Sequence, residues 1–267
     1  MNFDSYIVSE TKTAFSIPLT KNLVTKKTFK QKAFTLAETL ITLSIIGVIA
    51  AVTVPTLMSN VNKHIYVTGL KKAYSNIQNA IKMAPVNYDC SNGDFDCAYS
   101  AAHYGVGDSN VALIKLIADN TKVVKSCLNY NPEDCIQADY KSFEPTGYGS
   151  FITSDGAVYM ASTGFGTYNN GEEINCSGII VDVNGKKGPN KLDLDVFTFA
   201  VALKDARGIK AGTVLPQYSK IFSQYIGDNY YWRNSNVCEI SQINSRNRAG
   251  GESRCAGRVL EENAMNY

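Results

Sequence analysis

Seven cysteines carry the most evident chemistry of this sequence, because two nearby thiols can join in a disulfide. The chain has only two histidines, His64 and His103, and no cysteine pair has the C-x-x-C spacing of a thiol oxidoreductase or a zinc finger. We therefore expect structural disulfides rather than a metal or redox centre. The spacing suggests three local loops and leaves Cys176 over: Cys90–Cys97, Cys127–Cys135 and Cys238–Cys255.

A single carboxylate interrupts the most apolar stretch of the chain. Glu38 is the only charged residue between Phe34 and Val54. These 21 residues would form a helix of roughly 31 Å, which is long enough to cross the core of a bilayer. A charge inside hydrocarbon costs a few kcal/mol. Glu38 is therefore expected either to have a function or to reach water at the membrane boundary.

Sequence patterns of common enzymes are absent. The chain has no H-E-x-x-H, no G-x-S-x-G and no P-loop. The stretch "GFGTYNNG", which begins at Gly164, has the first two glycines of a dinucleotide-binding fingerprint but Asn169 in place of the third. We expect this stretch to belong to a flexible loop, and we expect no enzyme activity.

The composition indicates a folded protein with unevenly placed charge. Of the 267 residues, 45% are hydrophobic and 19% are charged, which excludes a disordered tail. The net charge of +2 argues against a nucleic-acid-binding domain, which usually has a concentrated basic face. The first 33 residues hold six lysines and two acids, a net +4, which leaves −2 for the remainder.

This charge asymmetry predicts the orientation of a membrane segment. The positive-inside bias places residues 1–33 in the cytoplasm and everything after residues 34–54 on the outer side. All seven cysteines then lie outside, which fits an oxidising compartment. A secretory signal peptide also has a basic start and an apolar core. The apolar run here is longer, however, and no small-x-small cleavage pattern precedes Pro55.

The stretch "AFTLAETLITLSIIGVIAAVTVP" resembles the N-terminal segment of type IV prepilins and type II secretion pseudopilins. The resemblance implies that residues 1–33 are a leader, which prepilin peptidase removes between Ala33 and Phe34. It implies N-methylation of Phe34 and identifies Glu38 as the family glutamate. Gly47 and Pro55 match the family's glycine and proline. The sequence departs from the pattern at Ala33, where the family usually has glycine, and in the length of the leader.

The same resemblance implies how the protein assembles. Removal of the leader creates a positive amino group on Phe34, and Glu38 of one subunit can meet that amine on a neighbour. The implied partners are other pilin-like subunits, prepilin peptidase, an assembly platform in the inner membrane and membrane lipid. The implied location is the cytoplasmic membrane, crossed once, and a filament after assembly.

A helical pattern continues beyond the predicted membrane segment. Residues 55–84 are expected to extend the N-terminal helix, and Pro85 is expected to end it. Gly69 and Pro55 are the positions at which this helix is expected to bend. One face repeats apolar or aromatic residues every three or four positions: Tyr66, Leu70, Ala73, Ile77, Ile81 and Ala84.

Residues 85–267 are expected to form an extracytoplasmic domain around an antiparallel sheet. Asp155-Gly156 lies between two apolar-rich runs, which is a strong hairpin signal. "CSGIIVDVNG" predicts another strand, and "DVFTFAVAL" predicts a further one. Residues 112–118 are the only short helix that the remaining pattern predicts. The expected fold class is α+β and pilin-like, with a long N-terminal helix, membrane-spanning in its first half, packed on the sheet.

The stretch "VDVNGKKGPNKLDLDVFTF" resembles a signature of many pilin-like proteins, D-x-N-G-x-x-G-P-N followed by D-x-F. A related loop in major pseudopilins binds calcium, and the resemblance implies four oxygen donors here: Asp182, Asn184, Asp193 and Asp195. Lys186 excludes an EF-hand, and the signature often has glycine at the position of Asp193. The alternative is that Asn184-Gly185 and Gly188-Pro189 are turns and nothing more.

Two classes of function remain open from the sequence. The first is a structural subunit of a type IV pilus or a type II secretion pseudopilus, incorporated through its N-terminal helix. The second is a membrane-tethered binding protein or enzyme with a prepilin-like anchor. A catalytic constellation in the outer domain would favour the second, and the sequence offers none.

Overall fold

The computed structural model of this chain describes residues 34–104, 106, 109–128, 135–136, 140, 149–169, 172–234, 236–239 and 253–267. The predicted leader, which includes Ala33, lies outside the described residues. The chain divides into two compact units, Met1–Ala51 and Val52–Tyr267.

The first helix, α1, begins at Leu36 and ends at Asn87. It therefore continues past Pro85, where the sequence pattern predicts an end. A proline removes one N–H donor but keeps a carbonyl acceptor. The Tyr88 amide donates to the Ala84 carbonyl at 2.9 Å, and the Cys90 amide donates to the Pro85 carbonyl at 2.7 Å. The last turn of α1 is therefore hydrogen-bonded although Pro85 itself has no N–H to donate.

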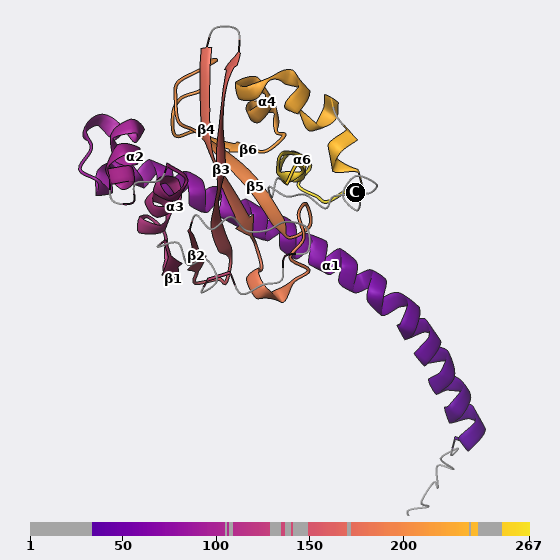
Figure 1. The fold of residues 1–267 in the computed structure, drawn as a ribbon. Helices are drawn as coiled ribbons and strands as arrows, with labels where there is room; N and C mark the ends of the chain where they lie inside the picture. Colours follow the sequence, from indigo (N-terminus) through magenta and orange to yellow (C-terminus); the bar gives the residue numbers. More distant parts are fainter. Residues whose placement is uncertain are drawn as a thin grey trace, which may run out of the picture. The chain divides into compact units, whose positions relative to one another are not determined.

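Among the described residues, six strands form one antiparallel sheet in chain order (Figure 1). The predicted hairpin at Asp155-Gly156 joins β2 to β3, where Phe151 lies opposite Tyr159. Residues 164–169 of the stretch "GFGTYNNG" are part of β3 rather than of a flexible loop, because they pair with β4, and the last two residues of the stretch lie outside the described residues. The strands are β1 Val123–Cys127, β2 Ser150–Thr153, β3 Val158–Asn169, β4 Glu172–Asp182, β5 Val196–Ala202 and β6 Val214–Pro216.

The second unit has more short helices than the sequence pattern predicts. The predicted helix, residues 112–118, lies inside α3. The other short helices have only seven to ten residues each, which is too few apolar positions to show a clear helical period in the sequence. The helices after α1 are α2 Phe95–Tyr104, α3 Ser109–Asp119, α4 Lys220–Ile226 and α6 Ala256–Glu262, with short 3₁₀ turns η1 Ser91–Gly93, η3 Gly185–Lys187, η4 Asp228–Tyr230, η5 Trp232–Asn234 and η6 Asn236–Cys238.

Helices cover both faces of the sheet. On one face, Phe197 and Phe199 of β5 pack with the second half of α1 and with α2, α3 and α6. On the other face, Ala200 and Ala202 pack with α4. All residues of β5 are buried, so this strand has no solvent face. This explains why "DVFTFAVAL" alternates weakly between apolar and polar residues.

The second half of α1 packs closely on the sheet through the predicted helical face. Leu70 and Ile77 are completely buried, and the ring of Tyr74 stacks on that of Phe199 with centroids 5.9 Å apart. A Cβ added to Gly69 would lie 2.8 Å from the Val183 Cβ, so only glycine permits this approach. The predicted α+β, pilin-like fold class is thereby confirmed.

Candidate functional site

The start of α1 contains a capping box that uses Glu38. The Glu38 Oε2 atom accepts hydrogen bonds from the Thr35 amide at 2.8 Å and from the Thr35 hydroxyl at 2.9 Å. In return, the Thr35 Oγ1 atom accepts from the Glu38 amide at 3.2 Å. This arrangement provides acceptors for backbone donors that the first turn of a helix leaves unpaired. The only carboxylate of the apolar segment therefore has a local structural role.

The hydroxyl side chains in the apolar half of α1 bond within the helix. The Thr39 hydroxyl donates to the Leu36 carbonyl at 2.8 Å, and the Ser44 hydroxyl donates to the Leu40 carbonyl at 2.8 Å. Hydroxyl groups that are hydrogen-bonded within the helix suit a bilayer, because no water is available there to form hydrogen bonds with polar groups. Ten large apolar side chains of this half are more than half exposed: Leu36, Leu40, Ile41, Leu43, Ile45, Ile46, Val48, Ile49, Val52 and Val54.

This half of α1 is long and apolar enough to cross a membrane, and no other helix among the described residues is. Gly47 lies within it, and a Cβ added there would meet nothing within 4 Å. Pro55 lies inside the helix and does not end it. The helix thus continues without interruption past both residues that match the family pattern.

Three disulfides join the pairs that the spacing suggests, Cys90–Cys97, Cys127–Cys135 and Cys238–Cys255. Cys176 is a free thiol that is buried in β4. It packs with α4, on the face of the sheet opposite the cluster that contains Cys238 and Cys255. Burial raises the pKa of the Cys176 thiol to about 12. Since the thiolate is the reactive form, this cysteine is poorly placed to attack a disulfide.

The loop between β4 and β5 brings two buried carboxylates together. Asp182 ends β4 and pairs in the sheet with Val196, which directly follows Asp195. Backbone amides solvate both side chains. The Gly185 amide donates to Asp182 Oδ1 at 2.8 Å, and the Asn190 amide donates to Asp195 Oδ2 at 2.8 Å.

Burial disfavours the charged forms of these two aspartates. Desolvation, followed by repulsion from Asp195, raises the pKa of Asp182 to about 7. Desolvation also raises the pKa of Asp195. The Tyr140 hydroxyl donates to Asp182 Oδ2 at 2.9 Å and offsets part of the effect on Asp182. A proton on one of the two carboxylates, or a bound cation between them, would therefore stabilise the pair.

Several other residues of the "DVNGKKGPN" stretch have roles in the turn itself. Gly185 has φ +59°, and a Cβ added there would lie 2.4 Å from the Gly156 carbonyl oxygen, so the loop requires glycine at this point. The Asn184 Nδ2 atom donates to the Gly188 carbonyl at 2.8 Å. The turn interpretation thus accounts for these residues without a ligand.

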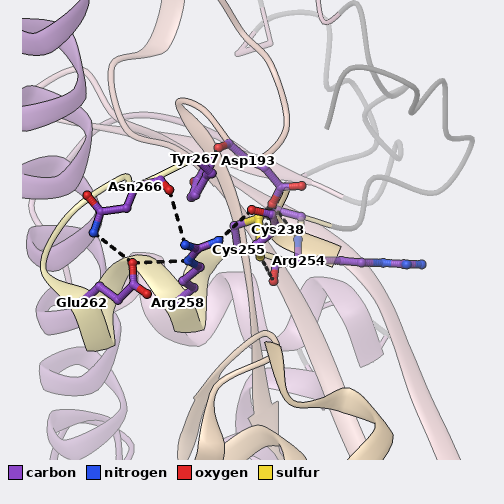
Figure 2. The surroundings of a disulfide bond; sticks show 9 residues. Asp193, Cys238, Arg254, Cys255, Arg258, Glu262, Asn266 and Tyr267 are labelled. Atoms are coloured by element: carbon purple, nitrogen blue, oxygen red, sulfur yellow. Dashed lines mark hydrogen bonds and ion pairs between the residues drawn. A yellow bond between two sulfur atoms is a disulfide. The ribbon is translucent and has the colours of Figure 1, made fainter. Parts of the chain in front are cut away.

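The four residues predicted to bind calcium do not all converge. The Asp193 side chain points towards the C-terminal segment (Figure 2). Its Oδ1 atom accepts hydrogen bonds from the amides of Arg254 at 2.6 Å and Cys255 at 2.8 Å. In the part of the chain that the structure describes, no three acidic, histidine or cysteine side chains form a metal-binding group.

The chemistry of the remaining residues still suits a hard cation. The Oδ1 atoms of Asn184 and Asn190 are buried and accept no hydrogen bond from the described residues. Amide and carboxylate oxygens are the ligands that calcium prefers. Calcium binding therefore stays a prediction, and Asp182 and Asp195 are the residues that would hold the ion.

Comparison with known proteins adds one finding. Residues 28–54 match the prokaryotic N-terminal methylation motif. The matched range contains the predicted cleavage site, Phe34 and Glu38. No curated protein and no solved structure matches the chain. The motif and the apolar half of α1 together indicate a processed protein that is anchored in a membrane by one span.

We expect Cys176 to be the one free thiol and to be unreactive in the folded protein. Burial and the raised thiol pKa should slow alkylation of the detergent-extracted protein by about a hundredfold or more. Unfolding in urea without reductant should expose this single thiol to iodoacetamide, as read by peptide mapping. Cys176→Ser should remove the label. Rapid labelling of the native protein, or a label on any other cysteine, would contradict the assignment.

We expect the stability of the second unit to fall as the pH rises. The folded state binds the Asp182 proton more tightly than the unfolded chain, in which the pKa of aspartate is about 3.9. This contribution is fully present below about pH 4 and is lost as the pH rises through about 7. It amounts to on the order of a few kcal/mol. Circular dichroism should show a declining Tm between about pH 5 and about pH 8.

Asp182→Asn should flatten this decline, because the titrating group is removed. Asp228→Asn is the control, since Asp228 is exposed. Equal pH dependence of Tm in the wild type and in Asp182→Asn would show that the buried pair does not govern it.

Calcium is expected to replace the proton at high pH. At about pH 8, above the pKa of Asp182, millimolar calcium should raise the Tm and a chelator should lower it. Asp182→Asn should abolish the response, whereas Asp193→Asn should keep it, because the Asp193 Oδ1 atom is hydrogen-bonded to the amides of Arg254 and Cys255. A Tm that responds to neither calcium nor chelator would leave only the turn role for this loop.

Proposed function

We propose, from the premise that this chain is a type IV pilin- or pseudopilin-like protein, that it is a structural subunit of a type IV pilus or a type II secretion pseudopilus. The methylation motif over residues 28–54 supports the premise. In this proposal prepilin peptidase cuts between Ala33 and Phe34, and Phe34 becomes N-methylated. The subunit then resides in the cytoplasmic membrane, with the second unit outside, until an inner-membrane platform joins it to other pilin-like subunits.

The observation that carries the proposal is the exposed apolar surface of α1 up to Val54. The hydroxyl groups on this surface donate hydrogen bonds to carbonyls of the same helix, so they need no polar partner outside it. Lipid tails can cover such a surface before assembly, and the apolar faces of other helices can cover it afterwards. A structural subunit has to exist in both states, in the membrane and in the filament.

Glu38 supplies the polar contact in this proposal. Thr35 occupies the Oε2 atom, whereas Oε1 accepts no hydrogen bond from the described residues. Cleavage before Phe34 leaves Thr35 and Glu38 in the chain, so the capping box is kept. The remaining oxygen can then accept a hydrogen bond from the Phe34 amine of a neighbour. Low-dielectric surroundings strengthen this attraction, and desolvation offsets part of the gain.

Substitution can separate the charge of Glu38 from its capping role. Glu38→Gln keeps an oxygen for the capping box but loses the charge, whereas Thr35→Ala loses the capping partner but keeps the charge. We expect Glu38→Gln and Glu38→Ala to lower incorporation into filaments by about tenfold or more, since a charge-assisted hydrogen bond contributes roughly 1.5–3 kcal/mol. Glu38→Asp should have a partial effect because its side chain is shorter. Thr35→Ala should assemble better than Glu38→Gln.

Incorporation is measured by shearing filaments from cells and immunoblotting the sheared fraction. Mass spectrometry of the membrane-extracted subunit is the control, and all variants should show an N-methylated Phe34 and 234 of the 267 residues. An intact Met1, or an N-terminus beyond Pro55, would refute the processing. Normal assembly of Glu38→Gln combined with failure of Thr35→Ala would assign Glu38 to helix capping alone.

A further inference from the structure

The Asp193 carboxylate gathers three donors from the segment that enters α6. Its side chain is almost completely buried, with 1% of the residue exposed. The Oδ1 atom accepts from the Ser253 hydroxyl at 2.7 Å, the Arg254 amide at 2.6 Å and the Cys255 amide at 2.8 Å. Figure 2 shows Asp193 directed at this segment, next to the Cys238–Cys255 disulfide.

The backbone conformation of Asp193 indicates that the carboxylate itself matters. Asp193 has φ +66°, a conformation that glycine adopts without steric cost and that other residues adopt rarely. Aspartate tolerates it better than most residues, and unlike glycine it provides an acceptor. The main chain is used as well, because the Tyr267 hydroxyl donates to the Asp193 carbonyl at 2.7 Å.

We propose that Asp193 is a positioning residue that fixes the C-terminal end of the disulfide-bounded stretch, residues 238–255, independently of the disulfide. The donors that it accepts would otherwise be buried backbone and hydroxyl groups without an acceptor, which is costly. A carboxylate is the acceptor best suited to three donors at once, because hydrogen bonds to a charged group are the stronger ones.

The start of α6 requires accurate placement of this segment. A Cβ added to Gly257 would lie 2.2 Å from the Ser219 amide nitrogen, so α6 lies directly against the backbone of the turn before α4. The Gly257 amide donates to the Gln217 carbonyl at 2.9 Å. Because α6 packs this closely, any shift of the helix would break its contact with the turn before α4. Holding residues 253–255 therefore holds α6.

The other end of the stretch is also held without a covalent bond. The Arg258 Nη1 atom donates to the Cys238 carbonyl at 2.9 Å (Figure 2). Arg258 Nε lies 3.3 Å from a Glu262 carboxylate oxygen, which orients the guanidinium. Asp193 thus holds Cys255, and Arg258 holds Cys238. It follows that breaking the disulfide lowers stability but leaves both ends of the stretch in place.

Residue-resolved hydrogen exchange on the full-length, detergent-extracted protein tests this proposal. In the double variant Cys238→Ser/Cys255→Ser, exchange of the Arg254 and Cys255-position amides should stay within about threefold of the wild type. In Asp193→Ala, with the disulfide intact, exchange of both amides should rise at least about tenfold, corresponding to about 1.4 kcal/mol. Asp193→Asn should give a smaller rise, because it keeps an oxygen acceptor without the charge.

Two further variants control for backbone and surface effects. Asp193→Gly removes the carboxylate while suiting the positive φ, so it should still expose the two amides. Asp205→Ala should leave them unchanged, although Asp205 also accepts a backbone amide, that of Ala211 at 2.8 Å. Unchanged exchange in folded Asp193→Ala would overturn the proposal.

The double cysteine variant decides the question even if an Asp193 variant fails to fold. Loss of protection at residues 254 and 255 in that variant would show that the disulfide, and not Asp193, holds the segment. Retained protection there would support the carboxylate as the anchor.

Discussion

The close packing of α1 residues 66–84 on the sheet is the contact on which the second unit depends. It buries Leu70 and Ile77 completely and brings Gly69 against Val183, the first residue after β4. Because Val183 opens the loop to β5, the helix fixes that loop where it leaves the sheet. The Tyr66 hydroxyl adds a longer contact, 3.5 Å, to the Gly188 carbonyl. The buried carboxylates of the loop owe their surroundings to this packing.

The loop between β4 and β5 buries three aspartates that have different roles. A buried charge needs donors, and backbone amides are the nearest supply. Asp182 and Asp195 accept amides from their own loop, and repulsion from Asp195 disfavours the charged form of Asp182. Asp193 takes amides from a segment more than fifty residues further along the chain. The first two are predicted to respond to a proton or to a bound cation, and the third is the proposed tertiary anchor.

The capping box at the start of α1 changes how the charge of Glu38 is understood. A carboxylate beside an apolar span is costly only if nothing solvates it. Thr35 provides a hydroxyl and an amide donor within the same turn. Glu38 is therefore accommodated in the isolated subunit as well as in the proposed filament. One oxygen serves the helix, which leaves the other for a neighbour.

The sequence by itself determined the elements whose signals are local. The apolar run up to Val54, the helical face from Tyr66 to Ala84 and the turn at Asp155-Gly156 each follow from periodicity or turn chemistry. Three cysteine pairs at short separations are joined as their spacing suggests, because a short loop closes most easily. The continuation past Pro85 was not determined in this way, because it rests on hydrogen bonds of the following turn.

Only the tertiary structure decided which groups meet across the fold. The short helices α2, α4 and α6 gain their stability from packing rather than from a long periodic pattern. Asp193 stands two residues before Asp195 in the chain, so sequence proximity groups the two as ligands of one ion. The positive φ at Asp193 and the donors at Ser253, Arg254 and Cys255 send its side chain elsewhere. Proximity along the chain does not fix the direction of a buried carboxylate, because that direction follows the hydrogen-bond donors that folding brings within reach.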